Sequence, residues 1–497
     1  MLWRFFPVFR LALSGSLILL TCCTLSLWKA GEAMAEAPAL KDLLGDNSFH
    51  VLPDAHTFNL KNGLSLVVIP EKRSPVVTQV VIYKVGGADD PPGKSGLAHY
   101  LEHLMFKTTT TSGGKLFSDR MRSIGDPNAS TTLDYTQYSE QVLSKDLRTA
   151  MELEADRMAN LLIDSEAAST ELQVVLEERL RRVESNPARK LWEEVTATLF
   201  RVSPYRTPTI GWKHDLEGLT PEDARKFYDT WYSPDNAVVL VFGDVEPGEV
   251  KTLAEEIYGE LPRRDQETSR RRIRPQEPVS SSSERTVSVK IGGLSALPGV
   301  SMNWLVPSRL SGVEGESEAI DVLCQLLSGG ISGRLYKQLV LEKKLAIYVA
   351  CSYSGSTVGD TMLSIGVVPS DKGSLEILRQ KIDEIIDKVL SEGVTDEELL
   401  RAKRRIIGSF VHAQDGQVNR ASLAARALAS GMSIEDVNSF PTRLYSVDEK
   451  AVRRIIREYM KPERLVVGYL IDEKFPSKET RERKTTGLLQ RIYNWLS

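Results

Sequence analysis

The sequence contains few cysteines and nearly equal numbers of basic and acidic residues. Only four cysteines occur in 497 residues, and two of them, Cys22 and Cys23, lie in an apolar stretch near the N-terminus. The 63 basic and 67 acidic residues are well mixed and leave a formal net charge of −4. Disulfide bonds are therefore not the main source of stability, as they are in small disulfide-rich folds. The protein also has no large positive potential that would attract nucleic acid.

The two remaining cysteines, Cys324 and Cys351, are too few to define a disulfide framework. One bridge between them is compatible with the sequence but is not implied by it. A metal site built on two cysteines this far apart is disfavoured. The length is more informative, because 497 residues exceed what one hydrophobic core usually supports. Two or more domains are therefore expected.

The first 35 residues have the pattern of a secretory signal peptide. Arg4 and Arg10 precede the apolar run LALSGSLILLTCCTLSLW, and small residues follow with a cleavage site at Ala33-Met34-Ala35. One alternative is a retained membrane anchor, since the run approaches spanning length. Another is lipid attachment at Cys22, although the preceding Leu-Leu-Thr matches a lipobox poorly. The sequence predicts a periplasmic or secreted protein, which touches a membrane only if this segment is retained.

Residues 50–261 alternate between strand and helix patterns. The stretch from Phe58 to Gly87 predicts a hairpin, because two β-branched runs are separated by turn residues and Asn62-Gly63 is a strong turn signal. Helical periodicity follows over 96–105, 145–162 and 170–183, and then come the strand NAVVLVFGDV and a helix beginning near Pro247. This order predicts an α+β domain.

Residues 262–285 interrupt this pattern, and after them it recurs. The segment is rich in Arg, Ser and Pro, so we expect a solvated linker. Residues 286–475 then repeat strands and helices, with long helices predicted over 314–327, 375–392 and 396–413. We predict two homologous α+β domains, each a mixed, mostly antiparallel sheet packed with helices, forming half of a clamshell. Residues 476–497 are a C-terminal tail.

The segment GLAHYLEHLMF, residues 96–106, carries the strongest chemical signal. On a helix, His99 and His103 lie four apart on one face, so both imidazoles can reach one point. Neutral imidazole is a good zinc ligand, and Glu102 is well placed for a water on that metal. The alternative is a pair of structural histidines. His-x-x-Glu-His is the inverted zincin signature, but five letters also arise by chance, so a third ligand is required.

The acidic helix STELQVVLEERLRRVESNP offers that ligand. Glu171 and Glu178 are seven residues apart and share a face, whereas Glu177 points about 100° away from Glu178. Either Glu171 or Glu178 could bind the metal, and the other would hydrogen-bond a ligating group. From the helix sequence alone, both are equally explained as surface glutamates.

Several further segments have a common resemblance. GLAHYLEHLMFK is similar to a metal-binding helix, and GDPNASTTLDYTQY fits the pattern Gly-x-x-Asn-Ala-x-Thr-x-x-Asp-x-Thr-x-Tyr. SPYRTPTIGW and FYDTWYSPDNAVVLVFGDV are similar to the end of a first domain. Together, and in this order, they resemble the pitrilysin/insulinase family of inverzincin zinc peptidases, in its two-domain processing-peptidase-like form. The second half contains no His-x-x-Glu-His.

The resemblance implies a zinc endopeptidase that cleaves unfolded peptides or small proteins. It assigns one zinc ion per chain to His99, His103 and Glu178. Glu102 becomes the catalytic base, and Glu171 becomes a supporting carboxylate. No serine or cysteine nucleophile is then required.

The resemblance also implies where a peptide substrate binds. An extended peptide would add as a further strand along Asn128, Ala129 and Ser130. An ordinary sheet strand after a turn at Asp126-Pro127 explains the same residues.

One departure from the family lies in the second half. Active single-chain relatives carry Arg and, seven residues later, Tyr, but LVLEKKLAIYVACSY places Val340 and Ile347 at those positions. Neither side chain donates a hydrogen bond to an oxyanion. Tyr348 is one residue off and would face the other side of a strand, although a register change could rescue it. We therefore expect the zinc-bearing subunit of a heterodimer whose homologous partner supplies Arg and Tyr; a homodimer is the alternative.

Two other functions fit the sequence less well. A non-catalytic subunit would hold peptides or stabilise a partner, but it has no use for an intact set of zinc ligands and base. A purely structural zinc normally has four protein ligands and no base beside it. The segment LSGGISGRLY resembles a Gly-rich stretch of the family and equally fits a turn between two helices.

Overall fold

The computed structural model describes residues 51–52, 54–264, 272–278, 283–292, 296–413 and 416–472. The predicted signal segment, including Cys22, and the predicted tail lie outside these residues. Within them, no helix combines the length and apolar character needed to cross a bilayer. The predicted domain boundaries stay predictions.

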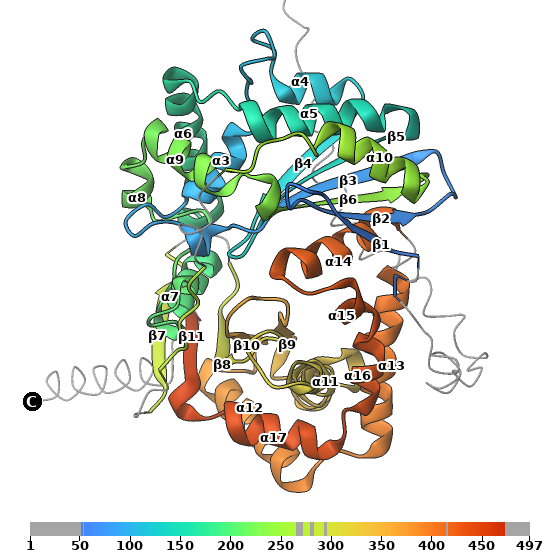
Figure 1. Ribbon diagram of the computed structural model, residues 1–497. Coiled ribbons are helices and arrows are strands. Elements are labelled where there is room, and N and C mark those ends of the chain that lie inside the picture. Colours follow the sequence, from blue (N-terminus) through green and yellow to red (C-terminus); the bar gives the residue numbers. More distant parts are fainter. Residues whose placement is uncertain are drawn as a thin grey trace, which may run out of the picture. The chain divides into compact units, whose positions relative to one another are not determined.

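The first half forms a six-stranded sheet in the order β1-β2-β6-β3-β5-β4 (Figure 1). Its strands are β1 His56–Asn59, β2 Ser65–Pro70, β3 Val76–Tyr83, β4 Gly125–Thr131, β5 Thr136–Leu143 and β6 Ala237–Gly243. The Asn62-Gly63 turn joins β1 to β2, which pair antiparallel. However, β6 lies between β2 and β3, so the two β-branched runs are not hairpin partners as predicted. The reason is that β6 is apolar and buried at every position, which suits an interior strand.

The second half forms a five-stranded sheet in the order β7-β11-β8-β10-β9. Its strands are β7 Arg285–Lys290, β8 Gly299–Val306, β9 Ala346–Tyr353, β10 Thr361–Pro369 and β11 Leu465–Ile471. Strands β7 and β11 pair in parallel, as β2 and β6 do in the first sheet, and the other pairs are antiparallel. The order therefore repeats that of β2-β6-β3-β5-β4. The prediction of two homologous α+β halves is confirmed.

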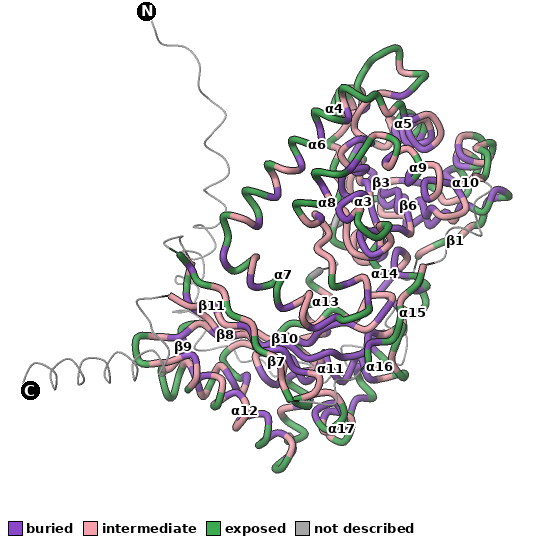
Figure 2. The backbone as a smooth tube through the Cα atoms, turned by 90° about the vertical axis from the view of Figure 1, so that its left-hand side faces the viewer, coloured by how far each residue is buried: buried purple, intermediate pink, exposed green. Residues whose placement is uncertain are grey.

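The helices of the first half, apart from α7 (Pro187–Leu199), pack on its sheet around a single apolar core. They are α3 Leu97–Leu104, α4 Phe117–Arg122, α5 Leu147–Asn160, α6 Ser165–Arg179, α8 Lys213–Glu217, α9 Pro221–Trp231 and α10 Pro247–Ile257. Helix α6 begins earlier than predicted because the Asp164 carboxylate caps it, accepting the N–H groups of Glu166 and Ala167. It continues into a π-helical turn over Leu180–Glu184. Figure 2 shows burial concentrated in the central strands and much of α6 exposed.

The second half has three helices that match the predicted ones closely, α11 Glu316–Ser328, α12 Leu375–Glu392 and α13 Asp396–Ala413. It also has further helices that were not predicted, α14 Gln417–Ser430, α15 Ile434–Asn438, α16 Phe440–Ser446 and α17 Glu449–Tyr459. The segment LSGGISGRLY contains a short 3₁₀ turn, Gly330–Ser332, that links α11 to a π-helical segment, Tyr336–Glu342. Cys324 on α11 and Cys351 on β9 are free thiols, and Cys324 is buried.

Each half lends a helix to the sheet of the other. Helix α7 packs on β7 and β11, and α14 packs on β3 and β6 (Figure 1). Leu191 and Val195 of α7 share an apolar cluster with Val466 and Leu470 of β11. The two halves are therefore joined by shared core as well as by the linker.

The prediction that the linker is simply solvated is wrong at two of its described residues, Arg274 and Glu277. The side chain of Arg274 is only 6% exposed and pairs with Asp89 at 2.9 Å and with Asp134 at 3.0 Å. The buried Glu277 accepts the backbone N–H groups of residues 201–203. Composition shows that the segment is polar, but the carboxylates and N–H groups that bind it come from distant parts of the chain.

Candidate active site

The metal-motif helix α3 is anchored at its start by two glycines and a carboxylate. Gly96 and Gly211 have positive φ values of 88° and 87°. A Cβ on Gly96 would lie 2.7 Å from the carbonyl oxygen of Ile210, and a Cβ on Gly211 would lie 2.4 Å from that of Ser95. Only glycine suits both the dihedral angle and the close approach. Asp90 also accepts the Gly96 N–H at 2.8 Å, which fixes the direction of the helix.

His99, His103 and Glu178 converge on one point. The Nε2 atoms of His99 and His103 lie 3.7 and 3.3 Å from Glu178 Oε2. One ligand atom from each of the three side chains lies within 4.8 Å of the others. Donors placed about 2 Å from a tetrahedral zinc lie about 3.3 Å from one another. The donor set and its spacing therefore fit a zinc ion, with a fourth position left for water or substrate.

Further charged groups hold the three converging side chains in place. His103 Nδ1 lies 2.8 Å from Glu171 Oε1, which favours the tautomer that leaves the Nε2 lone pair available to a metal. Lys107 pairs with the other oxygen of Glu171. Arg182 pairs with Glu178 Oε1 at 2.6 Å. The structure thus places Glu178 against both Nε2 atoms and Glu171 behind His103.

The electrostatics of the site favour a positive charge between the rings. Burial, and then the neighbouring His103, lower the pKa of His99 to about 4, so this ring is neutral. Burial opposes protonation of His103, but its hydrogen bonds to Glu171 and Glu178 outweigh burial and raise its pKa to about 9. Carboxylates that stabilise a proton here also provide the electrostatic condition for binding a metal cation.

Glu102 is held beside this cluster by strand β4. Its Oε2 accepts a hydrogen bond from the Thr131 hydroxyl at 2.6 Å. Burial raises the pKa of Glu102, and the Thr131 hydrogen bond only partly offsets that effect. Thr131 was not singled out from the sequence, although it is the Thr of the Asn-Ala-x-Thr pattern.

A cavity of about 780 Å³ opens over these residues and runs along β4. His99, Glu102, His103 and Glu178 line it together with residues 129–131. Strand β4 is the edge of its sheet. Asn128 and Ser130 are exposed, and the Ala129 N–H donates to the side-chain oxygen of Asn128 at 2.8 Å. The outer side of this strand therefore presents backbone groups next to Glu102.

Family models match both halves of the chain. Residues 66–212 match the family described as Insulinase (Peptidase family M16), and residues 218–406 match the Peptidase M16 inactive domain. The chain belongs to the M16 peptidase family.

Individual M16 relatives agree with this assignment. The zinc protease PqqE of Helicobacter pylori is 29% identical over 412 residues, which cover 82% of this chain and 91% of that protein. The crystal structure of a protease from Helicobacter pylori has a TM-score of 0.78 at 28% identity and covers 84% of this chain and 99% of that chain. The periplasmic protease PqqL from Escherichia coli has a TM-score of 0.70 at 18% identity, which shows the fold alone. The match covers 84% of this chain but 48% of PqqL.

The second M16 half departs from its sequence prediction at β9. Val340 is half-buried, whereas Ile347 and Tyr348 are 56% and 58% exposed. The pairing of β9 with β10 is interrupted by a bulge at Ile347. The register change that the sequence left open is therefore present here, and the alternation of a regular strand does not hold between Ile347 and Tyr348. Neither Val340 nor Ile347 offers a hydrogen-bond donor.

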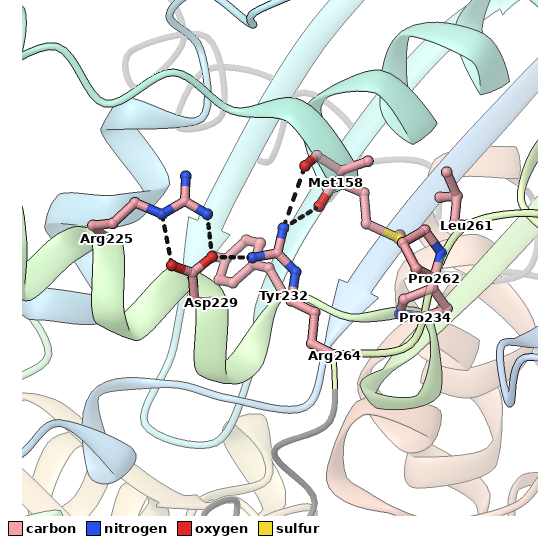
Figure 3. A pocket seen from close by; sticks show the side chains of 9 residues that line it. Met158, Arg225, Asp229, Tyr232, Pro234, Leu261, Pro262 and Arg264 are labelled. Carbon is pink, nitrogen blue, oxygen red and sulfur yellow. Dashed lines mark hydrogen bonds and ion pairs between the residues drawn. The ribbon is translucent and has the colours of Figure 1, made fainter.

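Another cavity, of about 530 Å³, lies beside α9 in the first half (Figure 3). Arg225 Nε donates to Asp229 Oδ2 at 2.7 Å, and Arg264 pairs with Oδ1 of the same aspartate. Arg264 also donates to the carbonyl of Met158 at 3.2 Å. These side chains bind one another and backbone carbonyls, whereas the metal-ligating side chains converge in the histidine cavity, so we place the candidate active site there.

Proposed function

We propose that this chain is an exported zinc endopeptidase that cleaves extended, unfolded peptides. The proposal rests on the convergence of His99, His103 and Glu178, with Glu102 beside them in a cavity along an edge strand. The zinc proteases among its relatives support the choice of metal. Zinc held by these three side chains would supply an activated water and would polarise the carbonyl of the peptide bond.

Glu102 is the general base of this proposal. Thr131 occupies its Oε2, so Oε1 accepts the proton of the attacking water and passes it to the nitrogen of the leaving amine. Burial of Glu102 raises its pKa, which makes the carboxylate a stronger base than an exposed glutamate. Glu171 keeps the His103 ring in its working tautomer and orientation.

Strand β4 is the substrate-binding edge of this proposal. A peptide that adds to its outer side would pair with the backbone around Ala129, flanked by Asn128 and Ser130, and would pass directly over Glu102. Backbone pairing requires an extended substrate, so a folded protein would be a poor one.

We further propose that a homologous subunit completes the site in a heterodimer. Val340 and Ile347 provide no donor for the developing oxyanion. The chain also matches only half of PqqL, whose fold therefore has room for a second such half in one chain. The exposed Tyr348 makes a homodimer the alternative.

The decisive experiment compares neighbouring glutamates of one helix. Glu178 lies at the metal point, whereas Glu177 is 70% exposed and pairs with Arg181 at 3.2 Å. We expect Glu178→Gln to lose zinc, measured by elemental analysis, and Glu177→Gln to keep one zinc per chain. We expect Glu102→Gln to keep zinc and to lose at least about a hundredfold in cleavage of an internally quenched peptide. Cleavage by Glu102→Gln at the wild-type rate would refute the proposed base.

A non-catalytic, peptide-holding subunit is the second candidate, favoured by the missing donors at Val340 and Ile347. The two functions separate when zinc-loaded chain is assayed alone and with its candidate partner. Binding of peptides without cleavage in either sample would establish the second function.

A further inference from the structure

Three arginines line the proposed peptide cavity. Arg181 and Arg182 lie on the π-helical turn after α6, and Arg189 lies in the first turn of α7. Two of them are partly neutralised, because Arg182 pairs with Glu178 at 2.6 Å and Arg181 pairs with Glu177 at 3.2 Å.

Arg189 is different from the other two. Its side chain is exposed, and among the described residues no carboxylate forms an ion pair with it. The carboxylates that line the same cavity are Glu102 and Glu178, which belong to the proposed metal site. A peptide in this cavity therefore meets an uncompensated guanidinium group.

A second cavity, of about 220 Å³, continues from the first. The two share Arg189 and Ile210 among their lining residues. The second has an apolar wall that includes Leu133 and Trp192. Trp192 is 46% exposed, which is unusual for so large an apolar side chain, and it follows Arg189 by three positions on α7.

The acid in this second cavity does not cancel the positive charge. Glu193 lines it, but both of its oxygens accept hydrogen bonds from Arg179, at 2.8 and 3.0 Å. Arg206 also lines the second cavity, where it donates to the carbonyl of Arg201 at 3.1 Å. The groove formed by the two cavities is thus basic at Arg189 and Arg206 and apolar at Trp192.

We propose that Arg189 and Trp192 set the substrate preference: the groove selects peptides with an acidic side chain near the scissile bond and a large apolar side chain farther along. This inference rests on the proposed peptidase function for the path of the peptide. Arg189 would bind a carboxylate through two parallel N–H groups, and Trp192 would pack against an aromatic or aliphatic side chain.

The test uses labelled peptides that are identical except for Glu, Gln or Lys at one scanned position. Binding is measured by fluorescence anisotropy to the zinc-loaded Glu102→Gln protein, so the result does not depend on turnover. We expect Glu to be favoured over Lys by about tenfold at low salt at one position. Adding Arg189→Glu should reverse the order, which an unfolded or merely destabilised protein cannot do.

The matched control is Lys226→Glu, which makes the same charge change at an exposed position of α9 outside the groove. It should keep the preference for Glu. A wild-type groove without preference, or equal behaviour of the two charge reversals, would overturn the role of Arg189.

Trp192→Ala should remove a preference for Phe over Ala at a second position and leave the Glu preference intact. An unchanged Phe preference would overturn the role of Trp192. Cleavage by the wild-type protein, measured in parallel, tests the peptidase function separately. Cleavage without charge preference refutes this inference alone. A reversible charge preference without cleavage, either by the chain alone or with its candidate partner, refutes the peptidase alone.

Discussion

At the scale of single residues, burial decides the charge state of Glu140. Glu140, Glu154 and Arg157 have side chains that are 0% exposed. The Arg157 guanidinium lies 3.7 Å from the centre of the Phe117 ring and donates to both carboxylates. One cation cannot balance two buried carboxylates, and burial, then the neighbouring Glu154, raise the pKa of Glu140 well above its usual range. Of these two carboxyl groups, Glu140 is therefore the one whose ionisation the folded domain opposes.

This charge state makes stability depend on pH. The pKa of Glu140 is higher in the folded than in the unfolded state. The contribution of protonated Glu140 to the free energy of unfolding is therefore complete at low pH and is lost as the pH rises through the folded-state pKa. We expect Glu140→Gln to remove this loss and to be more stable than wild type by about 1–2 kcal/mol at pH 8, with little difference near pH 5. Denaturant titrations across that range measure it. The exposed Glu256→Gln should show no such pH-dependent gain, and a gain as large there would contradict the explanation.

Glu171 carries a second prediction at this scale. Because Glu171 orients His103 without reaching the metal point, Glu171→Gln should weaken zinc binding by about tenfold to a hundredfold, rather than abolish it. Chelator competition gives the affinity. Glu177→Gln on the same helix is the control. Equal zinc affinities of the two variants would show that Glu171 does not position His103.

At the scale of elements, helix α13 is tied to the turn after α11 by one carboxylate. The Thr395 N–H donates to Glu398 Oε2 at 3.0 Å, and the Glu398 N–H donates to Thr395 Oγ1 at 3.2 Å. Arg334 donates to both oxygens of Glu398, at 2.9 and 2.8 Å. The hydrogen bonds from Arg334 are the main reason that the pKa of Glu398 falls to about 2.

Glu398→Gln should therefore lower the free energy of unfolding by about 1–2 kcal/mol at pH 7. Since the folded pKa is depressed, the wild-type advantage is present above the unfolded value of 4.5 and is lost as pH falls toward 2. Denaturant midpoints at pH 7 and pH 3.5 should show the gap narrowing. Glu397→Gln, whose side chain is 84% exposed, is the neighbouring control and should match wild type.

Element prediction from sequence succeeded where the signal is local. Amphipathic periods located α12 and α13, and the turn at Asn62-Gly63 was recognised because its residues are adjacent in the chain. The pairing of β2 with β3 was wrong because β6, far along the sequence, enters between them. Local patterns cannot report such an insertion.

At the scale of the whole molecule, Asp134 links the turn between β4 and β5 to the second half of the chain. Its carboxylate accepts hydrogen bonds from the Tyr205 hydroxyl at 2.5 Å, from Arg274 at 3.0 Å and from the Val358 N–H at 3.1 Å. The Tyr205 oxygen in turn accepts the Gly359 N–H at 3.0 Å. The Asp of the Asp-x-Thr-x-Tyr pattern thus has a structural role between the two halves.

Asp134→Asn should cost about 3 kcal/mol, because it leaves a buried arginine without its full counter-charge. Thermal unfolding measures the loss, with Asp126→Asn, an exposed position on β4, as control. A variant as stable as wild type would show that the halves are held by shared core alone.

The sequence by itself determined the metal motif, since the spacing of His99 and His103 follows from the period of one helix. It also determined the repeated fold, because strand and helix patterns are local. Only the tertiary structure decided that Thr131 reaches Glu102 and that Arg182 reaches Glu178. These contacts depend on the approach of α3, β4 and α6, and packing between distant segments fixes that approach.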